Sequence, residues 1–284
     1  MNYRHEYHAG SLSDVFKHTL LVGLIQALLV KETPLCYLET HAGSGLYDIS
    51  KALAQKTGES KEGIHKLMEQ ALAPLPPTLP PLLAKYVACV QQAGYPALYP
   101  GSPAIAQSLL RATDRVLLCE LHPPVYRLLK RNLRDTPAQI HAQDGFVGLN
   151  AFLPPKEKRG LVFIDPPFEK KEDWAQLIEG LEQSLKKFRQ GVYAIWFPIK
   201  DLKLVQLWIH RMQVLGLPNA WVFEWMFNHP KEIYWGLPGC GMLIVNMPFN
   251  LHHPLAESLS YLSKHLGRAN SAYRFYRLDD GSGT

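Results

Sequence analysis

Apolar residues recur along the chain with two spacings, and the alternation of these spacings predicts a mixed α/β fold. Residues 13–32 read as an amphipathic helix, with Ser13 as the predicted cap of its first turn. Its apolar side chains return at helical spacing, as in Phe16, Leu20 and Leu24. Short apolar runs bounded by polar residues predict buried strands. Such runs occupy 34–40, 115–121, 139–144, 160–165, 192–198, 220–227 and 242–248.

The order of these segments predicts the architecture. Helical or basic stretches, notably 123–134 and 173–189, separate most of the strands, which is typical of a parallel sheet covered on both faces. The last two strands are joined by a link too short for a helical crossover, so we expect a hairpin with one antiparallel strand. This α/β pattern resembles the Rossmann-like fold of class I S-adenosylmethionine (SAM)-dependent methyltransferases. We therefore expect a seven-stranded, mostly parallel sheet with one antiparallel strand.

The domain organisation follows from the same pattern. We expect one methyltransferase domain over residues 1–284, preceded by an N-terminal arm at 1–12. Residues 46–97 look helical and include the proline-rich stretch 73–83, so we expect them to form a small helical subdomain inserted after the first strand.

The composition allows a large core and a nucleic-acid partner. Of the 284 residues, 47% are hydrophobic and 19% charged, which is ordinary for a soluble protein with a sizeable core. The net charge of +5 fits a nucleic-acid partner without requiring one.

The cysteines and the N-terminus indicate a cytoplasmic protein. The four cysteines form no CxxC pair, and we expect them to be reduced thiols. The first ten residues lack an apolar signal core, and the longest apolar run, 19–30, is too short to span a bilayer. We therefore expect no membrane partner.

A glycine turn follows the first predicted strand in "LETHAGSGLYD". Glycines such as Gly43 let a ligand approach the backbone closely, as the methionine part of SAM does in methyltransferases. The dinucleotide fingerprint is incomplete, because Tyr47 and Asp48 replace its last glycine. An ordinary strand-to-helix turn explains this stretch equally well.

Acidic residues end the next two strands. Glu120 could accept hydrogen bonds from both ribose hydroxyls, since ligands bind beyond the carboxyl ends of strands in such sheets. Asp144, followed by Gly145, could accept a bond from an adenine amine. The alternatives are a solvated acid at Glu120 and a common Asp-Gly turn at Asp144.

The fourth strand ends in "FIDPPFEKK", which predicts catalytic chemistry. An adenine N6 amine is a weak nucleophile, and Asp165 together with the Pro166 carbonyl could accept its two hydrogens. The prolines, Pro166 and Pro167, would hold that carbonyl in place, and Phe168 could stack on an extruded base. Asp165 would then take the proton. The alternative is a rigid turn with a capping Asp.

Residues 3–18 carry three histidines, Arg4 and Lys17. No cysteine or acid lies at zinc-ligand spacing from these histidines, so we expect no metal. The stretch is either a basic arm with an Asp14–His18 pair on the helix or an arm that faces RNA. Sequence chemistry alone does not choose between them.

Several stretches together resemble one family. "YRHEYHAGSLSDVFKHTLL", "YLETHAGSGLY", "TGESKEGI", "YPGSP", "ELHP", "DGF" and "LVFIDPPFE" are similar, in this order, to the RlmJ family. These SAM-dependent methyltransferases modify an adenine N6 of bacterial 23S ribosomal RNA. The resemblance covers residues 3 to about 248. Phe168 stands where Tyr is common in the family, and Glu39 where Asp is usual.

The resemblance implies a role for each matching position. SAM would be the methyl donor and S-adenosylhomocysteine the product, without a metal. The residues lining the cofactor would be Lys17, His18, His41, Gly43, Ser102, Glu120, Asp144 and Gly145. Asp165 would be the proton acceptor in the Asp165–Phe168 motif. Tyr3, Arg4 and His5 would face the RNA in an arm that closes over the target.

The expected partner is 23S ribosomal RNA, protein-free or in an early assembly intermediate, bound by a monomer. A DNA adenine methyltransferase would use the same chemistry, but no separate target-recognition domain is visible beyond 46–97. A catalytically silent RNA-binding protein is disfavoured by the intact Asp-Pro-Pro-Phe motif, and a nicotinamide dehydrogenase by the incomplete glycine fingerprint.

Overall fold

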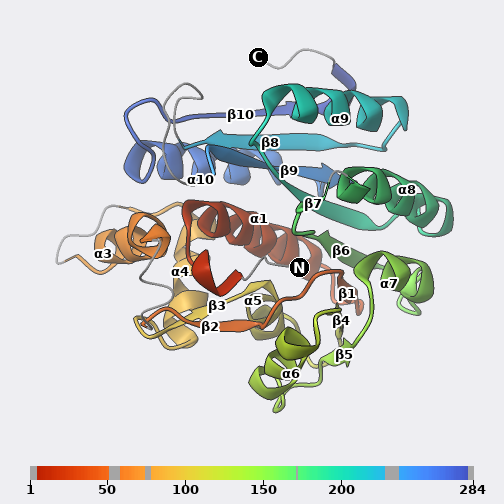
Figure 1. Cartoon of the computed structure of the whole chain (residues 1–284), viewed down its shortest axis with the longest axis horizontal. Coiled ribbons are helices and arrows are strands. Elements are labelled where there is room, and N and C mark those ends of the chain that lie inside the picture. Colours follow the sequence, from red (N-terminus) through yellow and green to blue (C-terminus); the bar gives the residue numbers. More distant parts are fainter. Residues whose placement is uncertain (1–4, 51–57, 74–77, 171, 228–236, 281–284) are drawn as a thin grey trace.

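One sheet crosses the molecule, and helices cover both of its faces (Figure 1). The structure is a computed structural model that describes residues 5–50, 58–73, 78–170, 172–227 and 237–280. The strands of the main sheet are β1 (Cys36–Glu39), β4 (Arg115–Cys119), β5 (Gln139–His141), β6 (Gly160–Ile164), β7 (Val192–Pro198), β8 (Trp221–Met226), β9 (Gly239–Val245) and β10 (Ala272–Arg277).

The strand order confirms the predicted fold class. The order is β10-β8-β9-β7-β6-β1-β4-β5, and the five strands from β5 to β7 are parallel. β9 is antiparallel to both of its neighbours, β7 and β8. Without β10, this is the seven-stranded arrangement of class I SAM-dependent methyltransferases, including the expected hairpin of the last two predicted strands.

The predicted strand count was one too low. β10 adds an eighth strand, antiparallel to β8, so two strands run against the parallel set. It lies in the tail, where the sequence pattern carried little signal. Its pairing depends on side chains of β8: Phe275 stacks on Phe223 with ring centroids 5.8 Å apart, and Arg274 forms an ion pair with the buried Glu224.

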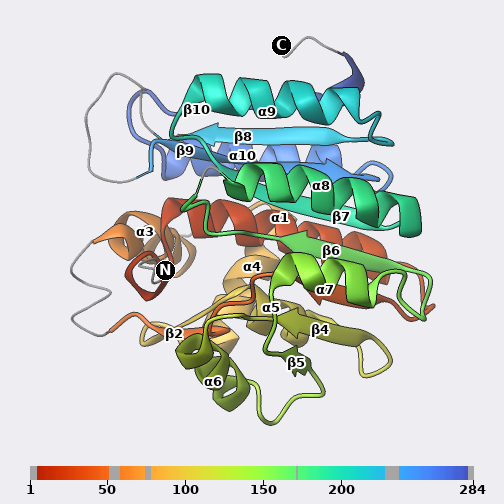
Figure 2. The ribbon, with the colours of Figure 1, turned by 45° about the vertical axis from the view of Figure 1, so that its right-hand side comes forward.

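Two hydrophobic clusters hold the helices against the sheet. One face carries α1 (Leu12–Leu29), α4 (Pro81–Gln92), α5 (Ser102–Leu109) and α10 (His252–His265). The other carries α7 (Gly145–Phe152), α8 (Glu172–Lys187) and α9 (Leu202–Val214), which lie together in front of the sheet in Figure 2. α6 (Pro123–Asn132) follows β4, and short helices complete the chain: η1 (His5–Tyr7), η2 (Lys61–His65), α3 (Lys66–Ala71) and η3 (Leu278–Asp280).

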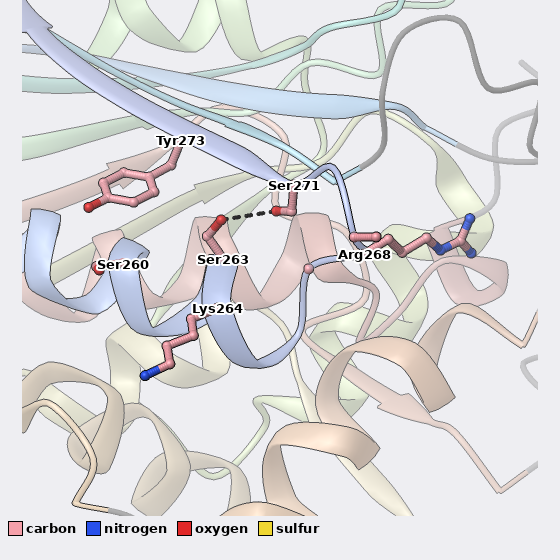
Figure 3. A pocket seen from close by; sticks show the side chains of 8 residues that line it. Ser260, Ser263, Lys264, Arg268, Ser271 and Tyr273 are labelled. Atoms are coloured by element: carbon pink, nitrogen blue, oxygen red, sulfur yellow. Dashed lines mark hydrogen bonds between the residues drawn. The ribbon is translucent and has the colours of Figure 1, made fainter.

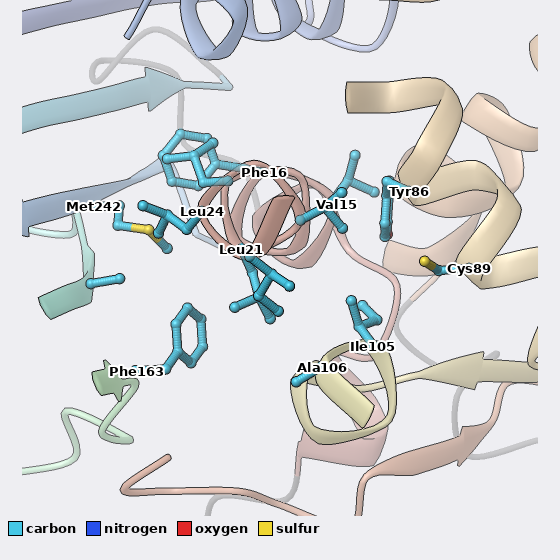
Figure 4. Packing of buried hydrophobic residues seen from close by; sticks show 14 of the residues in the cluster. Val15, Phe16, Leu21, Leu24, Tyr86, Cys89, Ile105, Ala106, Phe163 and Met242 are labelled. Carbon is cyan, nitrogen blue, oxygen red and sulfur yellow. The ribbon is translucent and has the colours of Figure 1, made fainter. Parts of the chain in front are cut away.

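The sequence pattern predicted that α1 is amphipathic, and this prediction was wrong. α1 is a core helix. Its residues are buried almost all round from Leu12 to Ile25, because α4, α5 and α10 pack on it opposite the sheet. Figure 4 shows Phe163 and Met242 of the sheet near it, with Tyr86 of α4 and Ile105 of α5 on another side. By length and composition it could cross a membrane, but 72% of it is buried inside the protein. Its cap is Ser11, whose hydroxyl accepts from the Asp14 amide, and not Ser13.

The segment after the glycine turn differs from the prediction. No helix begins there; β2 (Leu46–Asp48) follows and pairs antiparallel with β3 (Leu98–Pro100). The described residues between β2 and β3 form η2, α3 and α4, and the crossover helix to β4 is α5, which begins only at Ser102. β9 also begins at Gly239, three residues before the strand predicted at 242–248. A Cβ at Gly241 would lie 2.2 Å from the Phe197 ring, so this strand position needs glycine.

Candidate active site

The carboxyl ends of β1, β4 and β6 bring the predicted residues together at one edge of the sheet. β1 lies between β4 and β6, so the glycine turn after β1 is flanked by Glu120 on one side and by Asp165 on the other. Ligands bind at this edge in open parallel sheets. Residues far apart in the sequence therefore share one site.

Glu120 is held against the glycine turn. Its Oε2 accepts from the Gly43 amide at 2.9 Å, and its Oε1 accepts from the His122 amide at 2.8 Å. Burial raises the pKa of Glu120. Gly43 has φ +64°, and a Cβ there would lie 2.4 Å from the Tyr47 hydroxyl, so the turn requires glycine. Two residues predicted to bind the cofactor are thus in direct contact.

Asp144 caps α7. Its Oδ1 accepts from the amides of Phe146 (2.9 Å) and Val147 (3.1 Å), which is the local turn that the sequence allowed. Its Oδ2 is bonded to none of the residues that the structure describes. Gly145 packs on the end of β1, because a Cβ there would lie only 2.1 Å from the Thr40 carbonyl oxygen. The start of α7 is therefore held directly beside the glycine turn.

His41 lies between these two elements. Its Nδ1 is 2.8 Å from the Thr40 hydroxyl, and its ring meets the Phe146 ring edge-on at 5.3 Å. Burial lowers the pKa of His41. The lowered pKa favours the neutral imidazole, which contributes shape and hydrogen bonding.

Two exposed apolar side chains follow the acids. Leu121, directly after Glu120, is 57% exposed, and Val147 in the first turn of α7 is 58% exposed. Large apolar side chains in such positions can cover a flat ligand. Sequence reasoning missed both, since only their exposure distinguishes them from core residues.

Asp165 is paired with Lys17 of α1. The Lys17 Nζ lies 2.7 Å from Asp165 Oδ2 and 2.9 Å from Asp14 Oδ1. The Lys17 and Asp14 side chains are 5% and 1% exposed, and that of Asp165 is 16% exposed. One buried cation thus serves two carboxylates, while Asp165 Oδ1 bonds to no described residue. The sequence assigned Lys17 to the cofactor; the contact with Asp165 spans 148 positions and had no sequence signal.

The residues after Asp165 form an aromatic wall. Phe168 is buried, has φ +50°, and packs against Trp174 with ring centroids 4.5 Å apart. Trp196 of β7 lies 6.1 Å from Phe168, and the Lys17 Nζ is 5.7 Å from the Trp196 ring. A left-handed backbone is strained for a side chain of this size, and such strain concentrates at functional sites. Neither tryptophan was predicted.

A buried hydrogen-bond cluster joins β1 to α5. The fully buried Glu39 accepts from the Ser102 hydroxyl at 2.5 Å and from the Tyr37 hydroxyl at 2.8 Å. Burial raises the pKa of Glu39 to about 8, although these two donors and Lys17 lower it. Ser102, a predicted cofactor residue, is thus bonded to Glu39. The sequence analysis had noted Glu39 only because Asp is usual at this position in the family.

The remaining predicted residues lie toward the inserted segment. His18 is buried, and its Nδ1 is 2.7 Å from the Tyr99 hydroxyl, which is 2.9 Å from that of Tyr86. Asp14, which one reading of the sequence paired with His18, forms an ion pair with Lys17. Tyr3 and Arg4 lie outside the described residues, and His5 begins η1.

The arm beyond η1 contacts the insertion. His8 Nδ1 is 3.0 Å from a Glu59 carboxylate oxygen, and this bond raises the pKa of His8. The described residues hold no group of three or more His, Cys, Asp or Glu side chains placed to bind a metal ion.

A surface hollow lies elsewhere, between α10 and β10 (Figure 3). Ser263 and Ser271 bond to each other across it at 3.0 Å. Its lining is Ser260, Ser263, Lys264, Gly267, Arg268, Ala269, Ser271 and Tyr273. None of the predicted site residues lines this hollow, so it is not the site at the carboxyl edge.

Comparisons with known proteins match nearly the whole chain. Residues 32–277 match the model of a family described as "Ribosomal RNA large subunit methyltransferase D, RlmJ". The chain is 37% identical to ribosomal RNA large subunit methyltransferase J of Haemophilus influenzae, over 94% of each chain, and 36% identical to that of Escherichia coli, over 96% of each. A crystal structure of a Legionella pneumophila protein is 34% identical, covers 95% of this chain and 98% of its own, and superposes with a TM-score of 0.86.

Proposed function

Given that the chain belongs to the RlmJ family of ribosomal RNA large subunit methyltransferases, we propose that it methylates the exocyclic N6 amine of one adenine in 23S ribosomal RNA, using SAM. The observation that carries this proposal is the pairing of Asp165 with Lys17 beside the glycine turn. The substrate would be protein-free RNA or an early assembly intermediate, and the protein would act as a cytoplasmic monomer. We assign no metal to the reaction.

The residues at the carboxyl edge fit SAM. Glu120, already fixed by two backbone amides, has lone pairs left for the ribose hydroxyls. Asp144 Oδ2 is suited to an adenine amine, and Leu121 and Val147 to the faces of the ring. Gly43 leaves room at the turn for the methionine part. When bound, SAM supplies an electrophilic methyl group on a positively charged sulfur.

Further contacts would complete the cofactor pocket. His41 and Gly145 shape its floor between β1 and α7, and Ser102, held by Glu39, places the start of α5. Lys17 and His18 would act from α1, with Lys17 also acting on Asp165. These roles come from the family and from the positions of the residues.

Asp165 would orient and deprotonate the target amine. Lys17 neutralises Asp14 and holds Asp165 Oδ2, which leaves Oδ1 to accept from the N6 amine. The Pro166 carbonyl would accept the second hydrogen, with Pro167 restricting its direction. As N6 gains the methyl group, its proton passes to Asp165. Such preorganised acceptors act by positioning and electrostatics.

The base would be extruded into this pocket. Phe168, with Trp174 and Trp196 behind it, would offer a ring for stacking. Tyr3, Arg4 and His5 would close over the base from the arm, which is anchored to the insertion through His8 and Glu59.

The test compares Asp165→Ala with the wild-type protein on RNA from a strain that lacks this protein. We expect the variant to lose methylation while it still binds SAM, and the wild type to modify one adenine, identified by mass spectrometry. Near-wild-type turnover by Asp165→Ala would show that the assigned role is wrong. A parallel assay on duplex DNA separates the DNA methyltransferase alternative, since that enzyme would modify DNA and not ribosomal RNA.

A further inference from the structure

α6 and the turn that follows it carry a row of cations that neither catalysis nor cofactor binding explains. Arg127, Lys130, Arg131 and Arg134 are all exposed. Residues 122–134 contain these four cations and no acid, while the net charge of the whole chain is only +5. The row is therefore a concentrated source of positive charge on the described surface.

Three of the four side chains share one face of α6 and repel one another, and Arg134 follows in the turn after the helix. Arg127 and Arg131 are spaced by four residues, so they lie above one another, and Lys130 lies beside them. Like charges at this spacing destabilise a helix, and the helix dipole offsets this only in the last turn. Among the described residues, only Arg134 has a carboxylate partner, the exposed Asp135 at 3.1 Å.

The opposite face of α6 is fixed to the candidate active site. The Asn132 Nδ2 donates to the carbonyl oxygens of Ser44 (2.9 Å) and Leu46 (3.3 Å), next to the glycine turn. Leu129 is fully buried, and its Cδ1 would lie 2.9 Å from a Cβ at Gly45. α6 lies beside β2 and β5 (Figures 1 and 2). A partner bound to the basic row is thus positioned relative to the glycine turn.

The location also suits a ligand that reaches Asp165. β4, which leads into α6, is two strand positions from β6 in the sheet, on the order of 10 Å. A nucleic acid whose target base enters beside Asp165 would extend over this distance along its backbone. A second copy of the chain is a poor partner, since it would place one row of cations against another.

We propose that the basic row of α6 and the turn after it, namely Arg127, Lys130, Arg131 and Arg134, docks the phosphate backbone of the substrate RNA outside the target-base pocket. This inference rests on the proposed function, because it takes ribosomal RNA as the substrate. Phosphate contacts position an RNA without reading its sequence. The row would therefore set affinity and register, and the Asp165 pocket would select the base.

The test removes two charges from the middle of the row. In Arg127→Gln/Arg131→Gln we expect the Kd for a 23S RNA transcript to rise roughly 5- to 30-fold. The slope of log Kd against log salt should fall by about 1.5, since each phosphate contact contributes about 0.7–0.9. SAM affinity and the rate at saturating RNA should stay at wild-type values.

Two matched variants complete the design. Lys186→Gln/Arg189→Gln removes two exposed cations at the end of α8 far from the catalytic edge, and it should bind RNA as the wild type does. Arg127→Lys/Arg131→Lys keeps both positive charges. It should bind RNA nearly as tightly as the wild type if the Gln variant binds weakly because it lacks these charges and not because it is misfolded.

The outcomes separate the two proposals. If the wild type methylates the RNA but the Gln variant matches the α8 control in Kd and salt slope, the docking role of α6 is wrong and the proposed function stands. If the wild type methylates no RNA, the proposed function fails first. If the Lys variant binds as weakly as the Gln variant, the effect is not one of charge, and the docking role is again overturned.

Discussion

At the scale of single residues, Lys17 is the side chain on which the site depends most directly. It is the one described cation in contact with both Asp14 and Asp165, and it is almost fully buried. Replacing it by Met would leave two carboxylates without their counter-charge. We expect methylation to fall at least about 100-fold and the free energy of unfolding to fall by about 3–5 kcal/mol. Single-turnover rates and denaturant unfolding measure the two effects.

The Lys17→Met variant requires a control that loses an exposed cation in place of a buried one. Lys186→Met is the matched control, because its exposed pair with Glu182 contributes little. Intact activity in Lys17→Met would mean that Lys17 does not act on Asp165.

Glu39 predicts a dependence of stability on pH. Burial raises its pKa from 4.5 to about 8, so between these pH values the folded protein holds a proton that the unfolded chain has lost. The contribution of Glu39 to stability is therefore largest below pH 4.5 and declines as the pH rises toward 8, on the order of a few kcal/mol. Glu39→Gln cannot titrate and should lack this decline.

The measurement is the free energy of unfolding of both proteins across this pH range. The difference between Glu39→Gln and the wild type isolates the one carboxyl, and it should move in favour of the variant as the pH rises. A constant difference would indicate that Glu39 titrates near its ordinary pKa.

The sequence predicted individual site residues where a local motif carries them. Asp165, Glu120 and Gly43 stand at strand ends or in a glycine turn, and the structure brings them to one edge. Their roles toward cofactor and base remain predictions. The contact of Lys17 with Asp165 joins distant segments. Trp196 lies in a predicted buried strand, where the sequence pattern indicates a core residue. Such contacts exist only after the chain has folded.

At the scale of elements, the start of α7 lies in close contact with the end of β1, and one methyl group added at Gly145 tests this contact. A Cβ at residue 145 would lie 2.1 Å from the Thr40 carbonyl oxygen, so Gly145→Ala must push α7 away from β1. We expect a loss of about 1–3 kcal/mol in the free energy of unfolding, together with weaker SAM binding, because Asp144 moves with the helix. Thermal melts and SAM titrations measure these effects.

Gly216→Ala is the control for Gly145→Ala. Gly216 has φ +61°, and apart from its chain neighbours no described residue comes within 4 Å of the position that a methyl group would take there, so the substitution costs only backbone strain, about 1 kcal/mol. It should lower the melting temperature and leave SAM affinity unchanged. Equal SAM affinity in both variants would contradict a cofactor role for the start of α7.

Most elements were predicted within a few residues, because strands and helices here have distinct apolar spacing. The failures have physical reasons. α1 reads as amphipathic because its buried positions include Lys17, His18 and Thr19, whose hydrogen bonds are invisible in the sequence. β10 mixes Tyr, Arg and Phe, and its residues are exposed or only partly buried, so its strand character comes from its pairing with β8.

At the scale of the whole molecule, the sheet order decides which cofactor the edge suits. The glycine turn alone fits SAM or a dinucleotide, and the pattern of short apolar runs could not give the strand order. The order with β9 between β7 and β8 is that of SAM-dependent methyltransferases, and β10 extends this sheet without altering the edge that carries Asp165.

Ligand-induced stabilisation tests this assignment on the intact protein. A ligand that binds only the folded state at about 100 times its Kd stabilises it by about 2.7 kcal/mol, which for a chain of this size corresponds to roughly 5–10 °C in melting temperature. We expect SAM and S-adenosylhomocysteine to give this shift and NAD to give none. Asp165→Ala should keep the shift, and Glu120→Ala should lose most of it, since Glu120 is assigned to the ribose. A shift with NAD equal to that with SAM would mean that the glycine turn also binds dinucleotides and that the sheet order does not select SAM.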